Sequence, residues 1–268
     1  MIHFTLNTER THMKVISFFN LKGGCGKTTS VVNLGYLLAE DLKEKNGKVL
    51  LVDLDMQANL TNSLMDYDLD RPSVYHFLAD DTPIEDVIYE VRENIDLIPS
   101  SLLMATIEPR LILKDNRELL IKRGLESIAD RYDYCFLDCS PSFSTVTMNA
   151  IVASDDIFIP VQTEYYAVDG VHLLEDTLDY VNETLDINKS ITLMFATLHD
   201  TRNNINHIQY DNLKAAYGEK FMENVIHKNI SLVESPIFKQ SIFEYKPRAR
   251  GAQDYKKLYA EIVSKGGF

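Results

Sequence analysis

Runs of apolar residues, spaced along the chain, predict the buried strands of an α/β protein. The strongest runs are 15–19, 49–52, 134–138, 157–161 and 191–196. Most are nearly continuous and do not alternate with polar residues, which is typical of strands in a parallel sheet covered on both faces. Two weaker strands are expected, a short one at 94–99 that Pro99 ends and another at about 222–227.

Segments with helical spacing of their apolar residues lie between these runs. Such spacing predicts helices at 31–38, 101–131, 167–185, 204–217 and around Tyr255, Leu258, Ile262 and Val263. Residues 66–92 are acidic and helix-forming, with helix starts expected at 70–73 and 82–85. Strands that alternate with helices throughout indicate an α/β fold with a doubly wound, mostly parallel sheet and helices on both faces.

The length and composition are those of a folded α/β chain. The sequence has 268 residues, of which 45% are hydrophobic, and this is enough for a large core. No repeat or linker divides it, so residues 13–268 are expected to form a single domain. Residues 1–12 lack a helical or strand period and are expected to be a disordered extension or an upstream start.

The sequence favours neither a membrane-spanning protein nor a disulfide-rich protein. No run approaches the roughly 18 consecutive apolar residues of a membrane span, and no signal peptide is visible. The cysteines are Cys25, Cys135 and Cys139, and none has metal-ligand spacing with a histidine. An odd number of cysteines, in a chain that looks intracellular, favours free thiols over a disulfide framework.

A glycine-rich loop joins the first strand to the first helix. Its residues are Lys22, Gly23, Gly24, Cys25, Gly26, Lys27, Thr28 and Thr29. Glycines let a backbone turn tightly and aim several N–H groups at phosphate oxygens, and the following helix N-terminus adds partial positive charge. The sequence therefore predicts a phosphate-binding loop, in which Lys27 reaches the terminal phosphates and Thr28 ligates Mg²⁺. A glycine-rich turn with incidental lysines is the alternative.

The loop departs from the ordinary phosphate-loop pattern at its start. The usual first glycine would stand at position 21, and this chain has Leu21 followed by a second lysine, Lys22. Lys22 would add positive charge near a γ-phosphate. If it were supplied across a dimer interface, it would act as an arginine finger does.

Acidic residues follow the second and third strong strands. Asp53 and Asp55 come directly after 49–52, with Gln57 and Asn59 beyond them. Asp138 ends the apolar run 134–138, as a Walker B acid does. Because ligands of open α/β sheets bind outside the carboxyl ends of the strands, we expect these acids to meet the glycine-rich loop. Phosphates, Mg²⁺ and an attacking water need such a set of donors and oxygens. A helix-capping role is the alternative for the 53–59 segment.

Charge is distributed unevenly along the chain. Residues 1–200 contain 16 Lys and Arg against 33 Asp and Glu, whereas residues 201–268 contain 11 against 7. The formal net charge of −13 argues against DNA binding by the whole surface. A mildly basic C-terminal quarter still permits a local nucleic-acid surface, and a solvated face of mixed charge is the alternative.

Taken together, these motifs resemble the ParA family of deviant Walker A ATPases, close to its Soj-type members without an N-terminal helix-turn-helix. The resemblance covers residues 13–265 and is carried by FFNLKGGCGKTTSVVNLGYLLA at 18–39, VLLVDLDMQANLT at 49–61, YDYCFLDCSPSFSTVTMNA at 132–150, IPVQTEYYAVDGVHLL at 159–174 and YKPRARGAQDYKKLYAEI at 245–262. It implies a P-loop NTPase fold and the hydrolysis of ATP with Mg²⁺.

The resemblance also implies roles for the site residues. Lys22 would be the signature lysine, contacting the phosphate of the nucleotide held by a partner subunit, and Lys27 the lysine that acts in its own subunit. Asp55 would position or activate the attacking water. Thr28 would ligate Mg²⁺ directly, and two further residues would serve the metal through water. These two are Asp53 and Asp138.

The implied cycle is that of plasmid or chromosome partition. An ATP-bound sandwich homodimer would bind DNA non-specifically, and hydrolysis stimulated by a ParB-type centromere-binding protein would release it. Such a protein would be cytoplasmic and nucleoid-associated, with no membrane partner. The candidate DNA-binding residues are Arg202, Lys228, Lys239, Lys246, Arg248 and Arg250.

Departures from the family pattern leave other readings open. Met56 stands where a proline is usual, so a slowly hydrolysing DNA-binding scaffold is one alternative. Ser231 replaces a basic residue of the family's DNA-binding region. A MinD-like membrane-cycling ATPase needs a basic amphipathic C-terminal helix, whereas residues 262–268 are short and glycine-broken. A nitrogenase-iron-protein-like reductase needs bridging cysteines, and a bacterial tyrosine kinase needs a C-terminal tyrosine cluster. Neither pattern is present.

Overall fold

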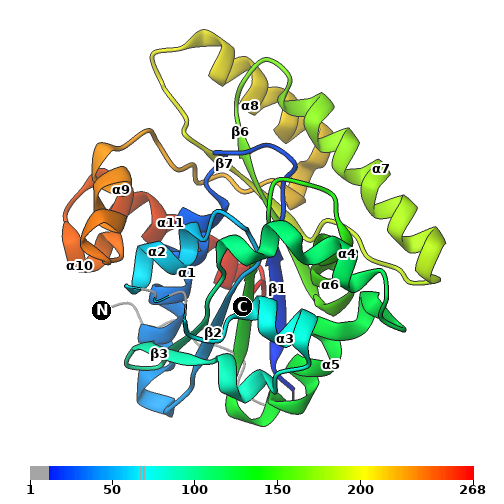
Figure 1. Cartoon of the computed structure of the whole chain (residues 1–268). Coiled ribbons are helices and arrows are strands. Elements are labelled where there is room, and N and C mark those ends of the chain that lie inside the picture. The colour runs from blue at the N-terminus through cyan, green and yellow to red at the C-terminus, as the bar shows by residue number, and fades with distance from the viewer. Residues whose placement is uncertain (1–11, 67, 69) are drawn as a thin grey trace.

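The described residues form one twisted sheet of seven strands between two layers of helices (Figure 1). The computed structural model describes residues 12–66, 68 and 70–268. The strand order is β3-β4-β2-β5-β1-β6-β7, with β3 antiparallel to β4 and all other neighbours parallel. The strands are β1 (Lys14–Phe18), β2 (Val49–Asp53), β3 (Tyr89–Arg92), β4 (Ile95–Ile98), β5 (Tyr134–Asp138), β6 (Asp156–Gln162) and β7 (Leu193–Thr197).

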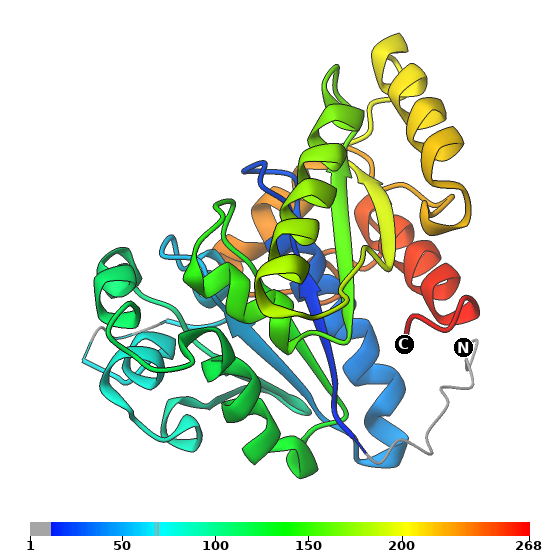
Figure 2. The same ribbon diagram turned by 90° about the vertical axis from the view of Figure 1, so that its right-hand side faces the viewer.

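Helices cover both faces, as the predicted doubly wound α/β fold requires. One face packs against α1 (Lys27–Leu42), α2 (Asn59–Leu64), α9 (Ile230–Glu234), α10 (Ile242–Tyr245) and α11 (Arg250–Ser264). The other packs against α3 (Val74–Asp80), α4 (Ile107–Leu111), α5 (Leu120–Ser127), α6 (Thr145–Ala153) and α7 (Ala167–Leu185). Helix α8 (Asn204–Tyr217) packs on α7, and Figure 2 shows the two helices from the side.

The strand residues divide between two cores because successive side chains point to opposite faces of a sheet. In β1, Val15 joins the core under α3–α7, whereas Ile16 and Phe18 join the core under α1 and α11. In β5, Cys135 and Leu137 belong to the first core, and the intervening Phe136 belongs to the second. Burial on both faces therefore explains why the strand sequences are almost continuously apolar.

Most of the predicted elements are confirmed, and four are wrong. The helices at 167–185 and 204–217 have the predicted bounds. Residues 89–92, predicted within a helix-forming region, instead form the edge strand β3, and 82–85 begins only a short 3₁₀ turn, Ile84–Val87. The predicted helix at 101–131 is divided into α4, α5 and 3₁₀ turns.

The predicted strand at 222–227 is also wrong. This segment runs beside the sheet but makes only two isolated bridges, Met194 with Phe221 and His199 with His227. Its apolar residues Met222 and Ile226 are buried against the α11 side of the sheet, which accounts for the strand-like pattern. The predicted extension 1–12 lies outside the described residues except for His12.

The segment after α11 packs into the sheet layer. Gly266 takes a positive φ of 74°, and the chain then returns so that Phe268 is 3% exposed. The Phe268 ring contacts the rings of Phe136 and Tyr259, with centroids 5.8 and 5.3 Å away. Among the described residues, no helix has both the length and the apolar content to cross a membrane.

We predict that Phe268→Ala lowers the free energy of unfolding by about 3–5 kcal/mol, the usual cost of removing a buried aromatic ring and leaving a cavity. Urea denaturation followed by circular dichroism measures this change. Leu113→Ala is the control, because Leu113 is 84% exposed and its truncation should change stability by less than about 0.5 kcal/mol. Equal stability of the two variants would contradict the packing described for Phe268.

Candidate active site

The site is built at the carboxyl ends of three adjacent strands. In the register of the parallel pairs, Asp138 at the end of β5 lies opposite Phe18 of β1 and Asp53 of β2. The N–H of Leu54 donates to the Asp138 carbonyl at 3.0 Å, an ordinary length for a backbone hydrogen bond, and so extends the pairing past the strand ends. The loops after β1, β2 and β5 therefore leave the sheet side by side, as the sequence predicts.

The loop at 22–29 has a backbone that requires glycine at two positions. Gly24 and Gly26 have φ values of 72° and 90°, which L side chains rarely adopt. Gly26 is the N-cap of α1, and its carbonyl accepts the N–H of Ser30 at 2.9 Å. The Thr197 hydroxyl at the end of β7 donates to the Cys25 carbonyl at 2.7 Å, which fixes the loop to the sheet.

The two lysines of the loop have different surroundings. Lys27 is 7% exposed, and its ammonium donates to the carbonyls of Asn20 and Lys22 at 2.9 and 3.2 Å. The Lys22 side chain instead leaves the loop and pairs with Glu164, just before α7, with Nζ 2.5 Å from Oε2. Only Lys27 is therefore placed inside the loop of its own chain.

Two buried carboxylates face the start of α1. The Thr28 hydroxyl donates to Asp138 Oδ2 at 2.6 Å, while Asp138 Oδ1 is buried without a hydrogen-bond partner among the described residues. Asp53 accepts from the N–H and the hydroxyl of Thr61 at 2.8 and 2.7 Å, and from the N–H of Asp55 at 3.1 Å. Thr61 was not predicted as a site residue, although it stands six residues after Asp55 in the same loop and helix.

Burial raises the pKa of both carboxyl groups. Desolvation raises the pKa of Asp53 to about 6, against the hydrogen bonds from Thr61 that lower it. Desolvation, followed by the negative charge of Asp53, raises the pKa of Asp138 well above its usual value. Two such carboxyls, one with a free buried oxygen, beside a threonine hydroxyl fit a hydrated Mg²⁺. In the part of the chain that is described, no three His, Cys, Asp or Glu side chains could hold a metal by themselves.

Asp55 is buried and lines the cavity beside the glycine-rich loop. Its Oδ1 accepts the N–H of Gln57 at 3.0 Å, and both residues line the main cavity. Met56 between them, at the position of the family's usual proline, is 44% exposed. The structure therefore brings Lys27, Thr28, Asp53, Asp55 and Asp138 together, whereas the Lys22 ammonium is turned outward.

A cavity of about 1110 Å³ extends from the loop to the segment before and within α9. The wall opposite the loop was not identified from the sequence, and it includes Asn229, Ile230, Leu232, Val233, Pro236 and Ile237. The flat face of a nucleotide base would suit this wall, because most of its side chains are aliphatic. The only sequence signal was the short apolar spacing in 230–238, which resembles ordinary core packing.

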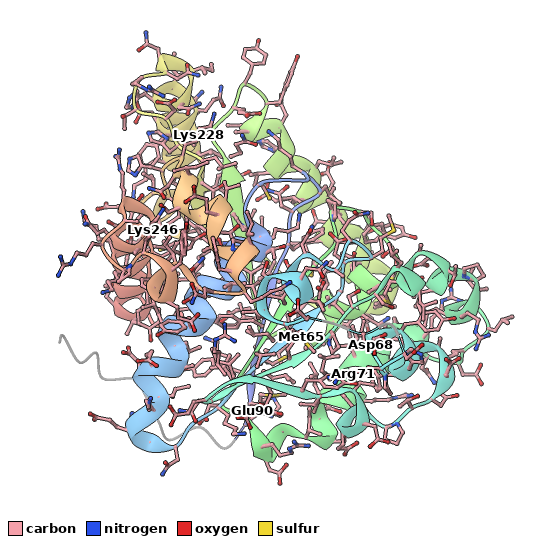
Figure 3. The ribbon with its side chains drawn as sticks, turned by 60° about the vertical axis from the view of Figure 1, so that its left-hand side comes forward. Met65, Asp68, Arg71, Glu90, Lys228 and Lys246 are labelled. Carbon is pink, nitrogen blue, oxygen red and sulfur yellow. The ribbon has the colours of Figure 1, made fainter. Side chains whose placement is uncertain are left out.

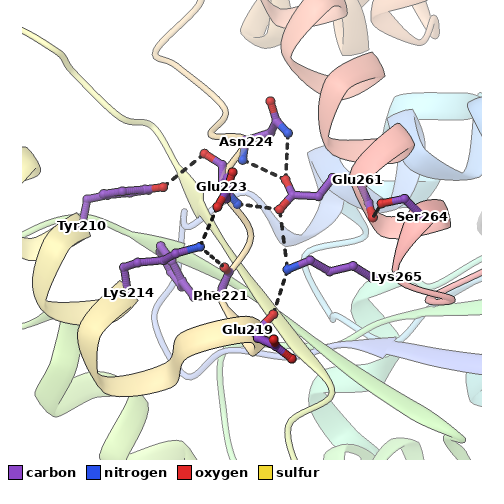
Figure 4. A network of polar contacts seen from close by, with 9 residues as sticks. All are labelled: Tyr210, Lys214, Glu219, Phe221, Glu223, Asn224, Glu261, Ser264 and Lys265. Atoms are coloured by element: carbon purple, nitrogen blue, oxygen red, sulfur yellow. Dashed lines mark hydrogen bonds and ion pairs between the residues drawn. The ribbon is translucent and has the colours of Figure 1, made fainter.

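A polar network fixes the chain that leads into this wall. The Glu261 carboxylate of α11 accepts the N–H groups of Glu223 and Asn224 at 2.7 and 2.9 Å (Figure 4). Lys214 of α8 donates to Glu223 and to the Phe221 carbonyl at 3.3 Å each. Helices α8 and α11 thus hold the 221–224 segment from both sides.

The six candidate DNA-binding residues do not form one patch of free charge. Lys228 and Lys239 line the main cavity, and Lys239 also reaches Asp66. Arg202 is paired with Asp200, and its guanidinium lowers the pKa of that carboxyl. Lys246 pairs with Glu234 at 2.9 Å, and Figure 3 shows it with Lys228 on one side of the molecule.

The remaining two candidates are free cations. Arg248 and Arg250 are exposed between α10 and the first turn of α11, and neither forms an ion pair within the described part of the chain. They lie beside Lys246 in sequence, so this turn carries the strongest local positive charge of the candidate set.

Known proteins match over nearly the whole chain. A family model described as an AAA domain matches residues 13–193. The sporulation initiation inhibitor protein Soj of Bacillus subtilis is 39% identical, with 94% of this chain and 99% of that protein aligned. The chromosome-partitioning ATPase Soj of Treponema pallidum is 36% identical over 95% of this chain and 98% of its own length.

A solved structure gives the same result for the fold. A plasmid partition protein from Borrelia burgdorferi, bound to AMPPNP, is 25% identical, has a TM-score of 0.78 and covers 94% of this chain and 99% of its own. The fold and the loop define a P-loop ATPase of the deviant Walker A class. The chain belongs to the Soj/ParA family of partition ATPases, as the sequence motifs predict.

We predict that burial of Asp53 makes the nucleotide-free and metal-free protein less stable as the pH rises. Its pKa is about 6 when folded and near 3.8 otherwise, so folding takes up a proton between these values. The stabilising contribution is complete below pH 3.8 and is lost as the pH rises through 6, in total on the order of 3 kcal/mol.

Urea denaturation of wild type and Asp53→Asn between pH 4 and 7 measures this contribution as the difference between the two pH profiles. The variant cannot titrate at position 53, so it should gain stability relative to wild type as the pH rises. Parallel profiles would contradict the raised pKa.

Proposed function

We propose that this chain drives DNA partition by an ATP-operated cycle of dimerisation, DNA binding and release. The observation that carries the proposal is the meeting of Lys27, Thr28, Asp53, Asp55 and Asp138 at one edge of the sheet. Phosphoryl transfer to water needs positioning and charge neutralisation more than covalent help, and these residues supply both.

Each residue has a part in binding ATP and holding its metal. The N–H groups of residues 23–29 and the Lys27 ammonium bind the phosphates, replacing the two carbonyls that Lys27 now contacts. Thr28 would ligate Mg²⁺ directly, and Asp53 and Asp138 would hold its water ligands. When bound, the ion would supply positive charge against the negative charge of the β- and γ-phosphates. Asp55, which lines the cavity, orients the attacking water.

Lys22 is proposed to act on the nucleotide of a second copy. Its side chain is 45% exposed, and the ammonium pairs with the carboxylate of Glu164, whose side chain is 51% exposed. An exposed ion pair of this kind contributes about 0–1 kcal/mol, so it is readily exchanged for a phosphate. The ATP-bound sandwich dimer would complete its two sites in this way.

DNA binding is proposed to centre on the turn between α10 and α11. Arg248 and Arg250 supply free charge there, and Lys246 adds to it. Lys228 and Lys239 lie at the cavity, so nucleotide binding and DNA contact share the segment around α9. A ParB-type partner stimulates hydrolysis, and the protein then leaves the DNA of the nucleoid.

We predict that Asp55→Ala lowers ATP turnover at least about 100-fold, the usual contribution of a group that orients or deprotonates the nucleophile. Phosphate release in the presence of DNA measures the rate. Asp115→Ala, which removes an exposed carboxylate far from this loop, should leave the rate unchanged. If Asp55→Ala kept its turnover, another group would position the water.

We predict that Lys22→Ala separates nucleotide binding from hydrolysis. A charge supplied across an interface is worth about 10³–10⁵ in rate, whereas ATP affinity should stay within about threefold because Lys27 is intact. Turnover, ATP-dependent dimerisation by light scattering and fluorescent-nucleotide titration are measured together. Lys122→Ala is the surface control. Unchanged turnover and dimerisation would rule out a trans-acting Lys22.

We predict that ATP-dependent DNA binding weakens steeply with salt, because each phosphate contact releases counterions. Arg248→Ala and Arg250→Ala should weaken binding to all sequences alike, and each should lower the slope of log K against log salt by about one. Arg123→Ala, on the opposite helical layer, is the control. Binding that ignored salt or ATP would count against this surface.

A further inference from the structure

Three histidines from separate parts of the chain meet beside the cavity. His199 follows β7, His207 lies in α8, and His227 directly precedes Lys228, which lines the cavity. The His199 ring has its centroid 5.3 Å from that of His207 and 5.8 Å from that of His227. Because His199 is only 5% exposed, little water is available to stabilise a positive charge on its ring. We call these three residues the histidine cluster.

Hydrogen bonds hold two of the three rings in place. The Nδ1 atom of His199 lies 3.1 Å from the hydroxyl of Thr163, the residue that follows β6. The Nδ1 atom of His227 lies 2.9 Å from Asp254 Oδ2 of α11. The cluster is not arranged as a metal site, because no group of three His, Cys, Asp or Glu side chains in the described ranges is placed to hold an ion. Its chemistry is therefore the uptake and release of protons.

The surroundings of His199 oppose a proton on its ring. Burial is the largest cause that lowers the pKa of His199, and the charges of His227 and His207 lower it further. Asp200 acts in the opposite direction, but it is paired with Arg202. The other charged or titratable groups described around the cluster come from α8, the segment before α9, and α11, and they are Tyr210, Lys228, Arg250 and Asp254.

Backbone hydrogen bonds connect the histidine cluster to the cavity wall. The His199 N–H donates to the Ile226 carbonyl at 3.0 Å, and the Lys228 N–H donates to the His199 carbonyl at 3.2 Å. Ile226, Lys228 and Leu198 all line the cavity. Leu198 has a φ of 51°, a left-handed conformation that is strained for a residue with a branched side chain. Separation of the rings would therefore release the wall and relieve this strain.

We propose that the histidine cluster is a proton-operated switch that releases the 226–228 wall and weakens nucleotide binding as the pH falls. At neutral pH, a neutral His199 packs edge-on against both neighbouring rings. On acidification, positive charges on adjacent rings repel one another. The open form exposes His199 to water and takes up protons more readily, so acid favours it.

The expected sign is opposite to that of Asp53, whose buried carboxyl favours the folded state at low pH. A loss of order near the histidine cluster on acidification is thus distinguishable from the effect of Asp53. The consequence for ATP rests on the proposed function, whereas the release of the wall does not.

Hydrogen exchange followed by NMR in the nucleotide-free protein tests the release of the wall. Protection factors, which correct for the intrinsic effect of pH on exchange, are compared at pH 7.5 and pH 5.5. Couplings between sites are typically 5–150-fold, so we expect the protection of the His199 and Lys228 amides to fall about tenfold. The amides of β5 report global unfolding and should not lose protection.

Two variants remove protons from the histidine cluster. His207→Gln changes an exposed residue of α8, so the fold should be retained, and the fall in protection should shrink to about threefold. His199→Asn keeps a partner for the Thr163 hydroxyl but cannot be protonated, so the fall should disappear. His172→Gln is the matched control, because His172 is an exposed histidine of α7 and should behave as wild type.

Titration with a fluorescent ATP analogue and Mg²⁺ at the same two pH values tests the consequence for ATP. Protonation of the nucleotide and of Asp53 affects every variant alike, so each affinity ratio is compared with that of His199→Asn. Wild type and His172→Gln should lose about tenfold more affinity on acidification than His199→Asn does.

Equal loss of protection in wild type and His199→Asn, or no loss in wild type, would overturn the switch. Lost protection with equal affinity ratios would overturn its link to ATP. A wild type that bound no nucleotide at pH 7.5 would instead contradict the proposed ATP site, and hydrogen exchange would still decide the switch.

Discussion

The site depends on the register of three parallel strands. Strand β5 pairs with β2 on one side and with β1 on the other. This register places Asp138 opposite Asp53 and opposite Phe18, after which the chain enters the glycine-rich loop. The Thr28 hydroxyl then spans from α1 to Asp138 at 2.6 Å. A shift of one residue in β5 would turn Asp138 to the opposite face and separate the phosphate loop from its metal-site acid.

In the described conformation both lysines of the glycine-rich loop have partners within the chain. Lys27 binds two backbone carbonyls, Lys22 binds Glu164, and burial favours protons on the Asp53 and Asp138 carboxyls. In the proposed cycle, ATP and Mg²⁺ would compete with each of these arrangements. Because bound ligands stabilise only the state that holds them, nucleotide binding can shift both lysines and both acids together. This supplies a physical basis for a two-state switch.

Local sequence signals predicted most of the buried strands, the helices at 167–185 and 204–217, and the meeting of the glycine-rich loop with the acids at the strand ends. They could do so because strand burial and loop chemistry depend on neighbouring residues. Other features, which depend on contacts between residues far apart in the sequence, were not predicted. The wall formed by Ile230, Val233 and Ile237 carries no phosphate-loop chemistry, and its place at the cavity follows only from the path of the 221–239 segment beside the sheet. Likewise, Tyr89–Arg92 has too few residues to show a strand period, and pairing with β4 decides its conformation.

The most direct test of the account is to locate the metal. Crystals of the chain grown with ADP and Mn²⁺, in place of Mg²⁺, would show the ion by its anomalous scattering. We expect one ion bound to the Thr28 hydroxyl and to a nucleotide phosphate, with Asp53 and Asp138 within reach of its water ligands. An ion that bound nucleotide without Thr28, or lay away from the ends of β1, β2 and β5, would contradict it.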